Sequence, residues 1–142
     1  MLLCVVSSLP AWAALGGNAA SVSADVDTLK GEVRTTLLQS YDIHEITDAN
    51  GMRIREYLSR RGSVFAVAWA GPVMPNLPRL LGSHFTAYAD ALLAQPRTGH
   101  RRSLRVVTAD LVLESGGHMR AIAGRAYLPA ELPAGVSPTD IR

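Results

Sequence analysis

Cysteine and lysine are nearly missing from this sequence. The single cysteine among 142 residues is Cys4 and the single lysine is Lys30, while thirteen of the fourteen basic residues are arginine. One thiol forms no internal disulfide, and because Cys4 falls in a segment that we expect to be removed, the remaining chain has no thiolate nucleophile. The net charge of +2 is too small to favour nucleic-acid binding. Composition therefore excludes a disulfide scaffold and argues against a nucleic-acid partner.

Recognised catalytic and cofactor motifs are missing as well. The sequence has no Gly-x-Ser-x-Gly element, which presents a nucleophilic serine on a strand-to-helix turn. Its four histidines are too far apart in sequence for a paired metal-ligand motif. Gly116-Gly117 neither opens a predicted helix nor precedes a phosphate-binding lysine. We therefore expect no metal and no cofactor, and we favour a non-enzymatic function.

The first thirteen residues have the pattern of a secretory signal peptide. An apolar run from Leu2 to Pro10 is followed by Ala11-Trp12-Ala13, the small-x-small sequence that signal peptidase reads. The run is too short for a membrane-spanning helix, which needs about 20 apolar residues. A typical signal peptide carries Lys or Arg before this run and this sequence does not, so a buried N-terminal strand or helix is the alternative. We predict cleavage after Ala13 and export to the periplasm or the medium.

Residues 14–142 are expected to form one globular domain without a membrane span. Three prolines make residues 129–142 a proline-rich C-terminal tail that cannot continue a strand ladder. Alternating apolar and polar residues predict five strands, with hairpin turns at Asn50-Gly51 and at Ser115-Gly116-Gly117. The expected strands run from Thr35 to Thr47, Met52 to Leu58, Val64 to Trp69, Leu104 to Glu114 and His118 to Leu128.

Two helices complete the predicted fold. Val22, Val26 and Leu29 recur at helical spacing and predict a short helix between Ser21 and Gly31. A longer apolar stripe between Asn76 and Ala94, with Asn76 as cap and Pro78 in the first turn, predicts an amphipathic helix. We expect an α+β fold: an antiparallel sheet of about five strands in two hairpin units, the long helix packed on one face, and a short N-terminal helix. Val64 to Trp69 is apolar on both faces and is the expected central strand.

Arginine and histidine side chains mark a candidate anion-binding surface. Arg53 and Arg55 alternate with apolar residues on one strand, and His118, Arg120 and Arg125 fall in the second hairpin of the same sheet. The alternative is an exposed sheet face on which arginines pair with glutamates across strands. Trp69, at the end of its strand, is a further candidate as a ligand platform, against the alternative of a core tryptophan.

The sequence also resembles a known family. The motifs that carry the resemblance are Arg55-Glu56-Tyr57, the segment from Val64 to Pro72, Leu80-Leu81-Gly82, Gly117-His118-Met119-Arg120, the segment from Gly124 to Pro129, and Leu132-Pro133-Ala134-Gly135-Val136. In this order they are similar to the secreted proteobacterial family catalogued as domain of unknown function 2844. The resemblance runs from about Leu15 to the end of the sequence. It implies an exported protein with a single domain, and it implies no activity or site residue.

Two functions from different classes remain. The first is an exported, non-enzymatic accessory or binding protein, whose partner is an anionic small molecule or an envelope protein. The second is a hydrolase or transferase with an unrecognised active site around His118, Arg120 and Trp69. A deep pocket that holds His118 or Trp69 beside a carboxylate would favour the enzyme, and a flat face would favour the binding protein.

Overall fold

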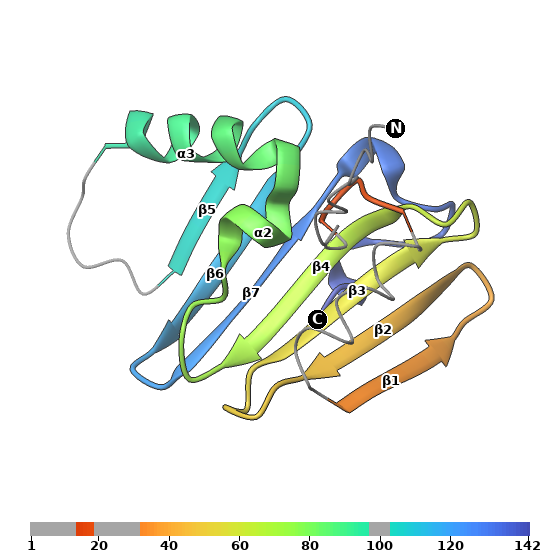
Figure 1. Ribbon diagram of the computed structural model, residues 1–142. Coiled ribbons are helices and arrows are strands. Elements are labelled where there is room, and N and C mark those ends of the chain that lie inside the picture. Colours follow the sequence, from red (N-terminus) through yellow and green to blue (C-terminus); the bar gives the residue numbers. More distant parts are fainter. Residues whose placement is uncertain (1–13, 19–31, 97–102) are drawn as a thin grey trace, which may run out of the picture.

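The fold is an open antiparallel sheet of seven strands. The computed structural model describes residues 14–18, 32–96 and 103–142 (Figure 1). The strands follow one another in the order β1-β2-β3-β4-β7-β6-β5, so that β4 is central and β1 and β5 are the edges. Their bounds are β1 Glu32–Leu37, β2 Tyr41–Thr47, β3 Arg53–Ser59, β4 Val64–Gly71, β5 Ser103–Val107, β6 Val112–His118 and β7 Ala121–Tyr127.

The expected five-stranded sheet is wrong because two predicted strands each contain a turn. The segment from Thr35 to Thr47 bends after β1, where Leu38 N–H donates to Tyr41 O at 3.0 Å. The segment from Leu104 to Glu114 bends after β5, where Thr108 N–H donates to Leu111 O at 2.9 Å. Neither turn contains glycine or proline, so the two strongest turn signals are missing at both places. The overall α+β class holds with seven strands instead of five.

The predicted turn of the second hairpin is also misplaced. Gly116 and Gly117 lie within β6, and the chain reverses at Met119 and Arg120 between His118 and its partner Ala121. Arg120 has a φ of 65°, which L-residues rarely adopt outside turns. Arg120 therefore belongs to the turn itself and does not alternate along a strand.

One helical segment spans residues 77–94, where the long amphipathic helix was predicted. It consists of α2 (Leu77–Leu81), a 3-10 turn η1 (Gly82–His84) and α3 (Phe85–Ala94). Asn76 Oδ1 accepts from Arg79 N–H at 3.1 Å, which confirms Asn76 as the cap. No helix among the described residues is long and apolar enough to cross a membrane. The predicted signal peptide and the predicted helix between Ser21 and Gly31 lie outside the described residues.

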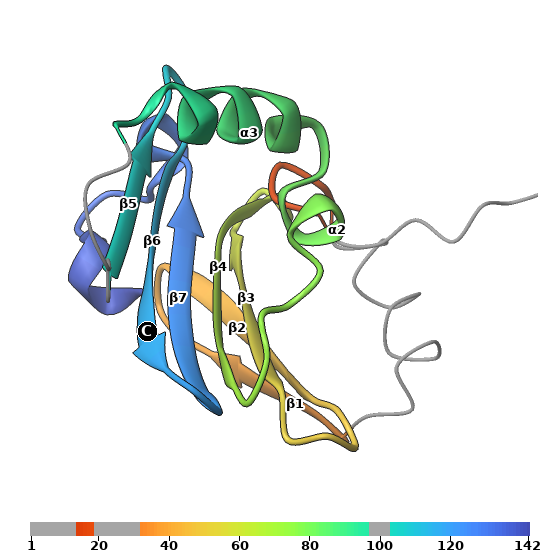
Figure 2. The ribbon, with the colours of Figure 1, turned by 90° about the vertical axis from the view of Figure 1, so that its left-hand side faces the viewer.

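The helical segment lies against part of one face of the sheet (Figure 2), and the first core is packed between them. Leu80, Leu81 and Tyr88 are buried there, and Phe85 packs against them, as the apolar stripe predicts. The strands contribute Leu58, Val64, Val67, Trp69, Val106, Leu113 and Ala126 to this core, and Leu111 and Leu128 join it from just outside β6 and β7.

The C-terminal segment, residues 129–142, lies on the opposite face and closes a second core (Figure 2). It carries two short 3-10 turns, η2 (Pro129–Glu131) and η3 (Pro138–Asp140), each of which begins at a proline. A bulge in β4 places Phe65 and Ala66 on this same face, because Tyr57 pairs with Ala66 and Leu58 with Val64. Ile141 is fully buried among Tyr57, Phe65, Ala66, Ala68, Val112 and Tyr127. The proline-rich segment is thus part of the packed fold.

Candidate functional site

A row of alternating charges crosses the sheet on the face that the C-terminal segment covers. Strand register places seven residues side by side, one from each strand, and we call them the charge row. They are Arg34, Glu45, Arg55, Ala68, Arg125, Glu114 and Arg105, in the order β1 to β5 across the sheet. Directly opposite side chains on one face of an antiparallel pair lie close enough for opposite charges to interact. The row is symmetric about the uncharged Ala68.

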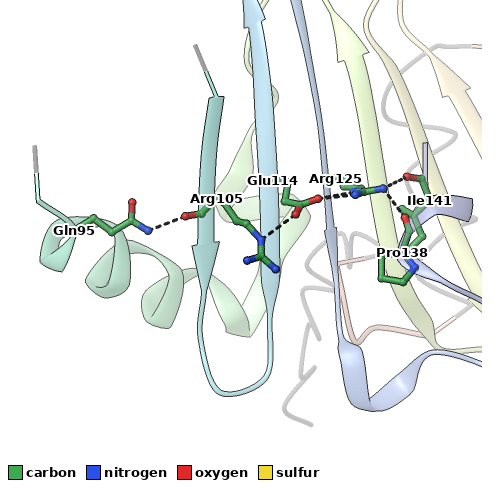
Figure 3. Close-up of polar contacts among 6 residues, drawn as sticks. All are labelled: Gln95, Arg105, Glu114, Arg125, Pro138 and Ile141. Atoms are coloured by element: carbon green, nitrogen blue, oxygen red, sulfur yellow. Dashed lines mark hydrogen bonds and ion pairs between the residues drawn. The ribbon is translucent and has the colours of Figure 1, made fainter. Parts of the chain in front are cut away.

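On one side of Ala68, Glu114 joins two arginines (Figure 3). Its Oε2 accepts from Arg125 Nε at 2.8 Å and from Arg125 Nη2 at 2.6 Å, and its Oε1 accepts from Arg105 Nε at 3.0 Å. The hydrogen bonds from Arg125 hold the pKa of Glu114 below its usual value, although partial burial opposes them. Glu114 therefore stays ionised, which suits an ion-pair partner and not a general acid.

On the other side of Ala68, Glu45 pairs with Arg55. Arg55 Nε donates to Glu45 Oε2 and forms the ion pair there. That hydrogen bond raises the pKa of Arg55, so the guanidinium is permanently charged. Arg53 and Arg55 share this face of β3, as their alternation with Ile54 predicts.

The C-terminal segment fills the centre of the charge row. Arg125 Nη1 donates to the carbonyl oxygens of Pro138 and Ile141, and Arg55 Nη1 donates to the backbone oxygen of Arg142. Tyr57 adds two bonds: its hydroxyl donates to Arg142 O at 2.8 Å and accepts from Arg142 N–H at 2.9 Å. Two of the predicted anion-binding arginines therefore bind backbone oxygen atoms of this chain.

Next to the row, towards the turn of the second hairpin, the sheet surface is hollowed. A cavity of about 570 Å³ lies there, and we call it the arginine-rimmed hollow. The residues of its floor are small and include Ala70, Ala123 and Gly116. Its rim carries the cationic Arg105, Arg125 and Arg142 with the anionic Glu114, and Ile141 forms one wall. A smaller hollow of about 150 Å³ adjoins it at Arg142 and contains Arg53 and Arg55. Because the floor residues are small, they leave the cavity open, and the arginines make its rim positively charged.

Two arginines of this rim have unused hydrogen-bond donors. Arg105 is 63% exposed at its side chain and uses Nε for Glu114, while its Nη1 and Nη2 bond to none of the described residues. The guanidinium of Arg142 likewise forms no ion pair with any described residue, and Arg142 is exposed. Planar guanidinium groups with free donors suit carboxylate or phosphate oxygens.

Trp69 is a core residue. It is 3% exposed and belongs to the first core, on the helix side of the sheet. Its ring lies directly on Gly124 of β7, where an added Cβ would stand 2.4 Å from Trp69 Cζ2. Trp69 and Gly124 are also among the residues that line the arginine-rimmed hollow. Its Nε1–H has no hydrogen-bond partner among the described residues.

The remaining predicted site residues are not brought together. His118 is exposed at the end of β6 and Arg120 is exposed in the turn, and neither lines the hollow. Arg105, Arg142 and Ile141 line the hollow and are not among the predicted site residues. Of the three, only Arg105 carries a signal in the sequence, because it belongs to an arginine-rich segment with Arg97, Arg101 and Arg102. No group of three or more His, Cys, Asp or Glu side chains that could hold a metal occurs in the described ranges.

Comparison with known proteins identifies one family. The family model described as "Protein of unknown function (DUF2844)" matches residues 11–141, which is nearly the whole chain. No curated protein and no solved structure matches the sequence or the fold.

Proposed function

Because the chain belongs to the DUF2844 family of proteins of unknown function, membership supplies no activity, and we propose from its geometry that the protein is an exported, non-catalytic binding protein. Its ligand is a small molecule with an apolar body and a carboxylate or phosphate group, held in the arginine-rimmed hollow. The observation that carries this proposal is the pair of arginines, Arg105 and Arg142, beside a floor of small residues: the Nη1 and Nη2 groups of Arg105 and the guanidinium of Arg142 bond to none of the described residues.

Charge and shape of the hollow support this ligand class. Three arginines and one glutamate line it, so its rim keeps a positive excess after Glu114 is paired. Alanine and glycine on the floor give an apolar surface that no large side chain occupies. Binding sites for small molecules commonly combine apolar walls with a few polar groups that fix orientation. An acid with an apolar body can contact the apolar floor and the arginines of the rim at the same time.

The enzymatic alternative finds less support. The hollow holds Trp69 beside the carboxylate of Glu114, but His118 lies outside it. Among the described residues that line the hollow, Glu114 is the only side chain that could act as a general acid or base. That carboxylate is fixed between Arg105 and Arg125, and its lowered pKa makes it a weak base. Export is supported by the signal-like pattern that ends at Ala13 and by the core contact that begins at Leu15, which is 2% exposed.

The proposal is tested with 8-anilinonaphthalene-1-sulfonate, which combines an apolar body with an anionic group. We expect saturable binding, displaced by decanoate and much less by the neutral decanol, because only the acid engages the arginines. The double variant Arg105→Gln/Arg142→Gln is expected to weaken binding about tenfold or more, as loss of two charge-assisted bonds implies. Ala123→Leu, at an exposed floor position, should fill the hollow and abolish binding.

Arg61→Gln is the matched control. Arg61 is exposed and lies outside the hollow, so its loss removes one positive charge without touching the site. Because the dye also binds partly folded proteins, each variant is first compared with wild type by near-UV circular dichroism and thermal unfolding. Equal binding by wild type, Ala123→Leu and the double arginine variant, all folded, would refute the proposed site.

A further inference from the structure

The two edge strands of the sheet, β1 and β5, differ in what lies against them. At the β5 edge, α3 lies against the strand, and Gln95 Nε2 donates to Arg105 O at 2.8 Å (Figure 3). Thr108 N–H donates to Leu111 O across the β5–β6 turn, and hydrogen-bonded and non-hydrogen-bonded pairs alternate along the ladder from this pair. Arg105 and Glu114 form a non-hydrogen-bonded pair, so the N–H and C=O groups of Arg105 point away from β6. Gln95 therefore occupies an outward carbonyl that would otherwise be open to another strand.

The β1 edge has no comparable cover among the described residues. The bond from Leu38 N–H to Tyr41 O sets the same alternation, so Val33, Thr35 and Leu37 direct their N–H and C=O groups away from β2. Five of the six β1 residues are exposed, and Leu37 is 72% exposed. The strand is regular, without proline or a bulge, which are common means of protecting an edge.

We propose that two copies of this chain associate through their β1 strands, antiparallel, about a two-fold axis at Thr35. In this register the outward backbone groups of Thr35 meet those of Thr35 in the second copy, and those of Val33 meet those of Leu37. All outward groups of both strands are then paired. The two sheets join into one continuous sheet with a closed, isologous interface.

Side chains on β1 match in this register. Val33 of each copy faces the exposed Leu37 of the other, and the two Thr35 side chains face each other, which are favourable cross-strand pairs. On the opposite face, Arg34 stands across from Thr36, so no like charges are directly opposite. Registers centred on Val33 or Leu37 leave part of the strand without a β1 partner. The sequence of β1 is thus complementary to itself in the register that the outward groups require.

The association is expected to be weak. One strand pair buries less than the roughly 1,200 Å² typical of stable interfaces, which places the dissociation constant in the micromolar range or above. Sedimentation velocity from about 10 µM to about 1 mM should therefore show the average mass rising from monomer towards dimer with concentration. A monomer at every concentration would overturn the proposal.

Charge variants at the axis provide the specific test. Thr35→Lys places two lysines opposite each other, as Thr35→Glu does with two glutamates, and each variant alone should remain monomeric. An equimolar mixture of the two should dimerise again, because lysine then faces glutamate. Val107→Lys on the exposed β5 edge is the matched control and should dimerise like wild type. Dimers that ignore Thr35→Lys, or a mixture that stays monomeric, would refute the β1 interface.

Cross-linking checks the register. In a Cys4→Ser background, Thr35→Cys gives a chain whose single thiol lies beside its counterpart in the second copy, and mild oxidation should form a covalent dimer. Thr36→Cys faces Arg34 and should cross-link much more slowly. Equal rates for the two variants would contradict a two-fold axis at Thr35.

Discussion

Arg55 and Arg125 lie opposite the same residue, Ala68, from the two strands that flank β4. Each arginine pairs outward with a glutamate, Arg55 with Glu45 and Arg125 with Glu114, and each turns a terminal nitrogen towards the C-terminal segment. The acidic neighbours fix the orientation of the guanidinium groups, so that their Nη1–H groups donate to backbone oxygens of the C-terminal segment. The charge row is therefore both a set of ion pairs and the attachment of residues 129–142.

Replacement of Arg125 should destabilise the protein clearly. Arg125→Met removes the bidentate contact to Glu114 and the donor to Pro138 O and Ile141 O, leaving partly buried acceptors without a partner. We expect a loss of about 2–3 kcal/mol in the free energy of unfolding, measured by urea denaturation. Arg105→Met is the control, because its more exposed pair with the same glutamate is worth at most about 1 kcal/mol. Equal losses for the two variants would contradict this division of roles.

The positions of the two hairpin turns decide whether the pairs Glu45–Arg55 and Glu114–Arg125 can be predicted from the sequence. The sequence correctly locates the first turn at Asn50-Gly51, but the loop also includes Ala49, because Asp48 N–H donates to Met52 O at 2.9 Å. This register pairs Glu45 with Arg55, whereas a two-residue turn at Asn50-Gly51 would set Arg55 opposite Ile46. The second hairpin was expected to turn at Ser115 to Gly117, a register that would set Arg125 opposite Val107. The actual turn at Met119 and Arg120 sets Arg125 opposite Glu114. Because the predicted turn lies a few residues too early, the predicted register does not bring Glu114 next to Arg125 and Arg105.

Glycine is ambiguous in sequence for a physical reason. Gly117 has a φ of +127° and lies so close to Ala121 O that a Cβ would be 2.1 Å away, so its role is close approach inside a strand pair. In the sequence the same residue indicates a turn. By contrast, the strand from Val64 and the helix cap at Asn76 were predictable, because their signals are local. The packing of the C-terminal segment depends on contacts across the whole chain, and no local pattern predicts it.

The contact between Trp69 and Gly124 should show strong coupling in stability. Gly124→Ala places a methyl group 2.4 Å from the indole and should destabilise by about 1–3 kcal/mol, because the ring is packed on its other side. Trp69→Leu also destabilises by leaving space in the core. In the Trp69→Leu background, Gly124→Ala should cost much less than in wild type. A double-mutant cycle by urea denaturation measures this difference, and additive losses would contradict the close contact.

Acid should destabilise the protein in two steps. Burial lowers the pKa of His44 below its usual 6.5, so the folded state resists protonation and stability falls as the pH drops below that value. The pKa of Glu114 is lowered from 4.5 by Arg125, so its contribution is present above that pH and is lost in a second, more acidic window. His44→Gln should remove the first step only. His118→Gln, at an exposed position, is the control and should leave both steps in place.

Export predicts a defined N-terminus. Cleavage after Ala13 leaves Ala14 as the first residue, one position before the buried Leu15, whose N–H donates to Leu80 O at 2.9 Å. Gly16 N–H and Gly17 O then bond to Val64 at the start of the central strand, so this short segment contributes to the fold and must survive processing. The pattern Ala11-Trp12-Ala13 places the peptidase site just outside these contacts.

Intact-mass measurement of protein from the periplasm or medium should therefore give a chain that begins at Ala14, and Ala13→Asp should block its release. A cytoplasmic species that retains Met1 in wild-type cells would contradict export, and a mature chain that lacks Leu15 would contradict the cleavage site.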